Sequence, residues 1–212
     1  MFYPIVYKIK GKRVVVIGGG QVAFRKVKDL VHCGANVVVI APEILTELEE
    51  YALANSAITI VKRQYHKGDC AGAALVFSAT NNPEVNRKVY DEASVLNIPI
   101  NAVDDPDNPS FYVPSFFTRG SLIVAVSTGG ASPAMAAKIR RLIEQSIPQD
   151  IETTLDMLNE ARTILKESYR NLTSHQRSEL LKAIVTDEML LEQAVKAFEN
   201  NTLHEFLKSL LK

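Results

Sequence analysis

Three small residues, Gly18, Gly20 and Ala23, follow the apolar run Val14–Ile17, and their spacing fits the pattern G-x-G-x-x-A. A glycine at position 18 lets the chain turn tightly off a strand, and a glycine at position 20 has no Cβ to block a pyrophosphate. Ala23 lets the next helix pack close to the sheet, with its free N–H groups toward the phosphates. The stretch therefore predicts a dinucleotide site; the alternative is a tight strand-to-helix turn that binds nothing.

An acidic residue that holds the ribose of such a cofactor is expected about 20 residues beyond the glycines. The second predicted strand ends in Ile40-Ala41-Pro42-Glu43, so Glu43 has the right charge but comes slightly late. No arginine stands nearby to hold a 2′-phosphate, and Glu43 and Glu47 would repel one. This charge pattern favours NAD over NADP.

The elements that must position these residues alternate along the first half of the chain. After Phe2–Ile9, which reads as an edge strand or an extended lead-in, strands are expected at 14–17, 37–40, 58–62, 75–78 and 98–103. Helices are expected at 21–32, 43–55 and 83–96. Alternation of this kind predicts an α/β fold with a parallel sheet, in which the strand ends at Gly18, Ala41, Thr80 and Asp104 converge on one crevice.

After Asp104 the alternation stops. Phe111–Phe117 and Ser121–Val126 look like a pair of strands outside the parallel series, and they need a partner to cover them. A small-residue loop follows, and Ser132-Pro133 is a typical helix start, with an N-cap serine before a proline. The remainder reads as helices at 150–167, 173–186 and 188–211.

Bulk properties exclude several classes of function. The 212 residues carry no formal net charge, and no concentrated basic face points to a nucleic acid. No apolar run is long enough to span a membrane, no signal peptide is evident, and two cysteines suit a reducing cytoplasm. The four histidines lack ligand spacing, so no metal site is predicted.

Several motifs occur together in an order that resembles a known family. They are Gly18–Lys26, Ser78–Asn82, Asn101–Asp104, Ser110–Pro114 and Val126–Pro133. Together they resemble the dehydrogenase module of siroheme synthases. The resemblance implies NAD-dependent oxidation of precorrin-2 to sirohydrochlorin, with Fe²⁺ insertion to give siroheme in some members. It also implies a Rossmann domain (1–113), a small α+β dimerisation and substrate region (114–148), an all-helical C-terminal domain (149–212) and a homodimer.

The resemblance also assigns individual positions. Asp104 falls at the family's catalytic aspartate, although the Asp-Asp-Pro context alone favours a loop-capping turn. Beside the glycines, cofactor contacts are expected at Gln21, Val22, Ala23, Pro42, Glu43 and Thr80. Thr128 falls where some members have serine in the small-residue loop. Contacts with the substrate's eight carboxylates are expected at Arg119, Lys138, Thr128 and the helix N-terminus at Ser132, and the alternative for each basic residue is an ordinary solvated helix face. The competing hypothesis is a regulatory module that senses NAD without catalysis.

Overall fold

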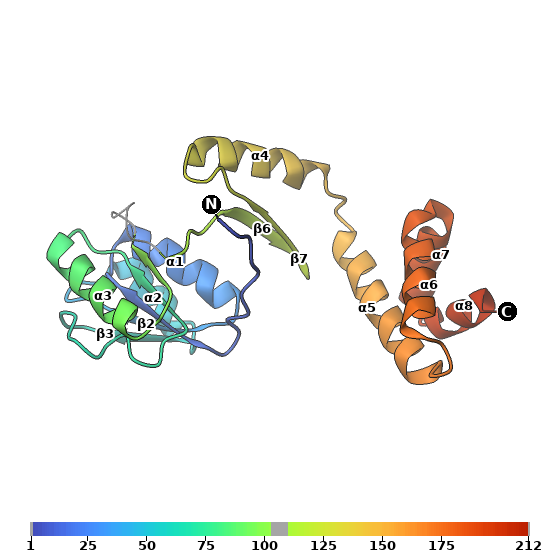
Figure 1. Ribbon diagram of the computed structural model, residues 1–212, viewed down its shortest axis with the longest axis horizontal. Helices are drawn as coiled ribbons and strands as arrows, with labels where there is room; N and C mark the ends of the chain where they lie inside the picture. The colour runs from blue at the N-terminus through green and yellow to red at the C-terminus, as the bar shows by residue number, and fades with distance from the viewer. Residues whose placement is uncertain (1, 103–109, 212) are drawn as a thin grey trace. The chain divides into compact units, whose positions relative to one another are not determined.

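The computed structural model describes residues 2–102 and 110–211. The chain divides into two compact units, Met1–Val113 and Pro114–Lys212 (Figure 1). In the part that is described, no helix is long and apolar enough to cross a membrane.

The first unit is built on a five-stranded parallel sheet with the order β3-β2-β1-β4-β5. The strands are β1 (Arg13–Ile17), β2 (Asn36–Ile40), β3 (Ile58–Val61), β4 (Leu75–Ser78) and β5 (Ile100–Ala102). The helices are α1 (Gln21–His32), α2 (Thr46–Leu53) and α3 (Pro83–Val95). The predicted parallel α/β fold is confirmed. The chain reverses its direction of winding between β1 and β4, which is where ligands bind in such sheets.

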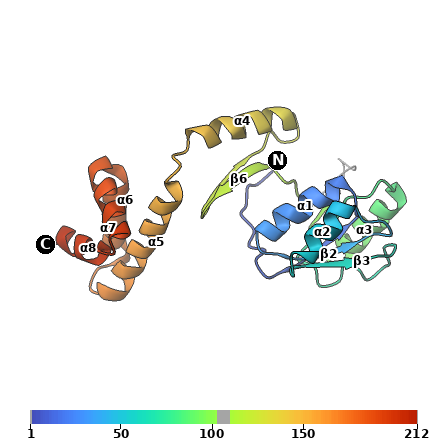
Figure 2. The same cartoon turned by 180° about the vertical axis from the view of Figure 1, so that it is seen from behind.

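Both faces of the sheet are covered. Alternate residues of β1 contribute to two clusters, with Val14 and Val16 on one face and Val15 and Ile17 on the other. The first cluster also holds apolar residues of α1 and α2, while the second holds residues of α3 (Figure 2). Strands buried on both faces need unbroken apolar sequence, which explains the run of β-branched residues at 14–17.

The connection from β3 to β4 contains no helix, in agreement with the expected elements, which place only a loop between these two strands. The loop is fastened to α3 by Glu92, whose carboxylate accepts hydrogen bonds from the hydroxyl of Tyr65 and from the backbone N–H groups of Gly68 (2.9 Å) and Cys70 (2.8 Å). Burial by itself would raise the pKa of Glu92, but these hydrogen bonds outweigh it and hold the pKa below its usual value. Burial, followed by the neighbouring Glu92, raises the pKa of Cys70 to about 12.

Near the ends of this unit the structure decides between two alternatives and corrects the start of one predicted strand. Residues 2–9 form no strand, which leaves the extended lead-in. The strand predicted at 111–117 begins only at Ser115, because Phe111 packs edge-on against Phe77 of the first unit, with ring centroids 5.5 Å apart. Burial of Phe111 and Val113 against the first unit's core therefore takes them away from the second sheet.

The second unit combines a β-hairpin with helices. Strands β6 (Ser115–Arg119) and β7 (Leu122–Val126) pair antiparallel, and α4 (Pro133–Ser146) packs on them. The helices α5 (Ile151–Ser168), α6 (Ser174–Thr186), α7 (Glu188–Glu199) and α8 (Leu203–Leu210) share one apolar core. The single helix expected at 188–211 is in fact α7 and α8. Asn201 breaks it with a left-handed backbone, φ 57°.

Candidate active site

The turn after β1 depends on Gly18. Its φ is +123°, which L side chains rarely adopt, and its N–H donates to the carbonyl oxygen of Ile40 at 3.0 Å. A Cβ at this position would lie 2.3 Å from the carbonyl oxygen of Ala79. The ends of β1, β2 and β4 therefore meet at a point where only glycine fits, which agrees with the tight turn predicted from the sequence.

Gly19 was not singled out by the sequence pattern, which permits any residue there. In the structure a Cβ at Gly19 would lie 2.3 Å from the carbonyl oxygen of Glu43, and the carbonyl of Gly19 accepts a hydrogen bond from Leu45 at 2.8 Å. This glycine lets the loop after β2 approach the loop after β1. The only hint of this in the sequence was that three glycines, residues 18–20, follow one another.

Gly20 differs from its two neighbours because a Cβ there would meet nothing within 4 Å. Gly20 is the N-cap of α1 and provides no side-chain cap, and the first turn of α1 contains no acidic residue. The helices α3, α4, α6 and α7 begin with a side chain that accepts from the helix N–H groups, whereas α2, α5 and α8 lack such a cap, as α1 does. The N-terminus of α1 therefore keeps its donors available for an anion.

The other cofactor residues expected on α1 and after β2 differ in their exposure. Ala23 is fully buried against the sheet, Val22 is half-buried, and Gln21 is exposed. Pro42 and Glu43 are both exposed in the loop that packs on Gly19. The negative charge of Glu43 thus belongs to the loop that contacts the glycine turn, as an acid that binds a ribose should.

Thr80 lies on the opposite side of the turn, just after β4. Its backbone nitrogen would be 3.3 Å from a Cβ on Gly18. Its hydroxyl is hydrogen-bonded to Asn86 of α3, and Asn86 also binds Ser78. Sequence reasoning missed Asn86, and it named Ser78 only as the start of the motif Ser78–Asn82. The hydrogen bond between these two residues had only a weak sign in the sequence: a polar residue ends an apolar strand, and another lies early in the next helix.

Asp104 lies outside the described residues. The described chain stops at Ala102, which pairs with Ser78 at the carboxyl end of β4. It resumes at Ser110, whose N–H donates to the carbonyl of Ile100 at 2.9 Å and whose hydroxyl accepts from the N–H of Ile100 at 2.6 Å. The residues that flank the 103–109 segment are therefore both held at β5.

The predicted substrate residues all lie in the second unit. Arg119 donates from Nη1 to the carbonyl oxygens of Ile147 and Pro148, at 2.9 and 2.8 Å, and so satisfies the end of α4. The hydroxyl of Thr128 closes the small-residue loop by bonding both backbone groups of Ser132, whose side chain caps α4 as predicted. Lys138 is exposed and pairs with no residue of the described chain.

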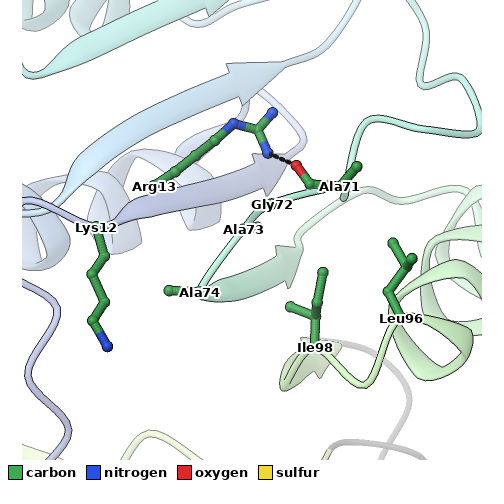
Figure 3. A pocket seen from close by; sticks show the side chains of 8 residues that line it. All are labelled: Lys12, Arg13, Ala71, Gly72, Ala73, Ala74, Leu96 and Ile98. Carbon is green, nitrogen blue, oxygen red and sulfur yellow. Dashed lines mark hydrogen bonds between the residues drawn. The ribbon is translucent and has the colours of Figure 1, made fainter.

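A shallow cavity of about 500 Å³ lies at the other edge of the sheet (Figure 3). It is lined by Lys12, Arg13, Ala71, Gly72, Ala73, Ala74, Leu96 and Ile98. There the guanidinium of Arg13 donates a hydrogen bond to the carbonyl oxygen of Ala71 at 2.7 Å. Because β1 and β4 begin at this edge, the cavity lies away from the glycine turn and does not belong to the candidate site.

Comparisons with known proteins agree with this geometry. A family model described as "Putative NAD(P)-binding" matches residues 5–115, just over half of the chain. A second model, described as "Sirohaem biosynthesis protein central", matches residues 119–146. The two matches follow one another along the chain, as the glycine turn and the hairpin with α4 do.

Curated relatives and a solved structure extend the similarity over most of the chain. Siroheme synthase of Methylobacillus flagellatus is 36% identical over 90% of this chain, and siroheme synthase of Ectopseudomonas mendocina is 44% identical over 69%. The chain spans only 41% and 31% of those two proteins. The structure of SirC, a precorrin-2 dehydrogenase, superposes with a TM-score of 0.74 at 25% identity and covers 98% of both chains.

Proposed function

Because this chain belongs to the NAD(P)-binding family, as a siroheme synthase dehydrogenase module, we propose that it oxidises precorrin-2 to sirohydrochlorin with NAD⁺. The observation that carries the proposal is the glycine turn between β1 and α1, which stands at the reversal point of a parallel sheet and leaves open space over Gly20. The match over 98% of a precorrin-2 dehydrogenase structure supports the choice of substrate.

The described residues fit the cofactor. The uncapped N-terminus of α1 would hold the pyrophosphate, with Gln21 and Val22 in its first turn, and Glu43 in the loop after β2 would hold a ribose. Thr80 would contribute from the end of β4. When bound, NAD⁺ accepts the hydride that leaves the substrate.

Oxidation of precorrin-2 removes a hydride and a ring proton, so a base is needed beside the substrate. We assign this role to Asp104, two residues beyond the last residue of β5. The support for this assignment is the family resemblance together with the sequence position: Asp104 follows β5 in the chain, as Gly18 follows β1 and Thr80 follows β4.

The substrate carries eight carboxylates, and cations are its natural partners. Lys138 is the strongest candidate, because its ammonium group is exposed and unpaired within the described chain. Nη1 of Arg119 already donates to carbonyl oxygens at the end of α4, so only the other N–H groups of its guanidinium could bind a substrate carboxylate. In the loop between Thr128 and Ser132 the N–H groups of Gly129 and Ala131 already donate within the loop, which leaves the N–H of Gly130 for the substrate.

The direct test is to incubate the purified protein with precorrin-2 and NAD⁺ and to follow the absorbance of NADH. We expect NADH from the wild type and a rate lower by about 10²- to 10⁴-fold in Asp104→Asn. Absence of NADH from the wild type would contradict the enzyme and leave the regulatory, NAD-sensing alternative. Full activity in Asp104→Asn would contradict only the role of that residue.

Iron insertion into sirohydrochlorin is a separate proposal, which rests on the family resemblance. Among the residues that the structure describes, no group of three or more His, Cys, Asp or Glu side chains could hold a metal. Fe²⁺ would then be a transient substrate that meets Asp104 and the pyrrole nitrogens. Adding Fe²⁺ or Co²⁺ to sirohydrochlorin with and without the protein tests this activity.

We further propose a homodimer in the reducing cytoplasm, where Cys33 and Cys70 would stay free thiols. Three apolar side chains of α4, Met135, Ile139 and Leu142, follow one another at helical spacing and are 48%, 37% and 57% exposed. Half-exposed Ile123 adds to the apolar surface of the hairpin. A two-stranded sheet with one helix leaves such surface uncovered, and a second copy would bury it.

A further inference from the structure

Asn86 is a buried polar residue of α3, 8% exposed, and it holds a cluster at the carboxyl end of β4. Its Oδ1 accepts hydrogen bonds from the hydroxyl of Ser78 at 2.7 Å and from the hydroxyl of Thr80 at 2.8 Å. Its Nδ2 donates to the backbone carbonyl of Thr80 at 3.0 Å. The side chain thus fixes both the backbone and the hydroxyl of Thr80.

The direction of these hydrogen bonds limits what Thr80 can offer to a ligand. A carbonyl can only accept, so the group of Asn86 that faces the Thr80 carbonyl must be the NH₂, and the group that faces the two hydroxyls must be the oxygen. The hydroxyl proton of Thr80 is therefore committed to Asn86, or to the carbonyl of Asn82 at 3.2 Å. Its oxygen also accepts from the N–H of Asn82 at 3.1 Å, and one lone pair remains.

The residue that carries this lone pair lies beside the glycine turn. Thr80 is half-exposed, and its backbone nitrogen is 3.3 Å from the place where a Cβ of Gly18 would stand. A dinucleotide on the N-terminus of α1 presents two kinds of hydrogen-bond donor, the ribose hydroxyls and the N–H groups of the nicotinamide carboxamide. Both need an acceptor.

We propose that Asn86 is a positioning residue for the cofactor: it presents the hydroxyl oxygen of Thr80 as an acceptor for a ribose hydroxyl or the carboxamide of the dinucleotide. This inference rests on the proposed function, because it presumes a dinucleotide at the glycine turn. Asn86 itself is buried and acts only through Thr80.

Binding of NADH to the full-length protein, followed by its fluorescence, tests the inference without the chemical step. We expect Asn86→Ala and Thr80→Val to raise the Kd for NADH by about tenfold, because each removes the fixed acceptor. Thr80→Ser keeps the hydroxyl and should bind like the wild type. Ser78→Ala is the matched control: it removes a buried hydrogen bond to the same Oδ1 but leaves Thr80 in place, so its Kd should stay within about twofold.

A second titration with ADP-ribose, which lacks the nicotinamide, identifies the donor. A weaker Kd for ADP-ribose in Thr80→Val points to the ribose, and an unchanged Kd together with weaker NADH points to the carboxamide. Thermal unfolding of each variant shows that it is folded, and if Asn86→Ala does not fold, Thr80→Val decides.

Wild-type affinity for NADH in Thr80→Val would overturn the inference, as would a loss in Ser78→Ala equal to that in Asn86→Ala. A wild-type protein that binds neither NADH nor NAD⁺ would contradict the proposed function instead, and the inference with it.

Discussion

Gly18 and Ala79 approach each other so closely that a Cβ on residue 18 would stand 2.3 Å from the carbonyl oxygen of Ala79. Residue 18 also has a φ of +123°, so it must be glycine for two independent reasons. Gly20, two positions later, has neither restriction: its φ is −88° and its Cβ position is empty. Substitution of these two glycines by alanine is therefore expected to have different effects.

Gly18→Ala should destabilise the protein by at least about 2 kcal/mol, since the strained φ and the contact with a backbone carbonyl both oppose it. Gly20→Ala should change the free energy of unfolding by no more than about 1 kcal/mol, because its methyl group meets nothing and restricts the unfolded chain, whereas alanine is a poorer N-cap than glycine. Chemical denaturation measures both.

The same Gly20→Ala variant should bind NADH at least about tenfold more weakly, because its methyl group takes the space kept for the pyrophosphate. A fluorescence titration measures the Kd. The free energy of unfolding of the same variant serves as the control, because it shows that the variant is folded. Wild-type affinity in a folded Gly20→Ala protein would mean that the pyrophosphate does not lie over this residue.

Glu43 should determine the choice between NAD⁺ and NADP⁺. Glu43→Gln removes the negative charge that repels a 2′-phosphate, so the ratio of kcat/KM for NADP⁺ to that for NAD⁺ should rise by about tenfold. Glu50→Gln, an exposed change on α2, should leave the ratio as it is. If Glu43→Gln and Glu50→Gln give the same ratio, another residue reads the ribose.

Glu92 should make stability depend on pH in the acidic range. Its pKa is lower in the folded protein than in the unfolded chain, so its contribution is fully present above the usual pKa of glutamate and is lost as the pH falls through the folded value. Glu92→Gln should therefore lower the free energy of unfolding by about 1–3 kcal/mol at neutral pH, with a smaller difference in acid.

Denaturation curves at several pH values measure this effect. Asp91→Asn, which breaks an exposed pair with Arg87 on the same helix, should change stability little at any pH. A difference between Glu92→Gln and the wild type that grows toward low pH would have the wrong sign and would contradict the assignment.

The exposed apolar stripe of α4 predicts the oligomeric state. Sedimentation should give about twice the chain mass of 23.4 kDa for the wild type, and Ile139→Glu should shift it toward a monomer, because a charge would be buried in the interface. Leu53→Glu, at a more exposed apolar position in the first unit, should not change the mass. A monomeric wild type would rule out the dimer.

The spacing of residues along the chain was enough to predict much of the first unit. The sequence alone predicted α1 at 21–32 and β4 at 75–78 with the bounds that the structure shows, as well as a parallel sheet and the tight turn at Gly18, but not the order of the strands. Buried strands and capped helices have characteristic neighbours along the chain, so their signals do not depend on distant residues. Asp104 and the contacts of the cofactor remain predictions.

Only the tertiary structure showed that Gly19 must be small, that Asn86 holds Thr80, and that Arg119 binds the end of α4. In the first and third cases the partner is a backbone carbonyl oxygen, which every residue has and which no sequence pattern marks. The way in which the loop between β3 and β4 is held also depends on a distant residue, because Glu92 reaches that loop from more than 20 positions away along the chain. The glycines of the motif could be predicted from their spacing. The residues that pack around them could not, because they are far apart in the sequence and only folding brings them into contact.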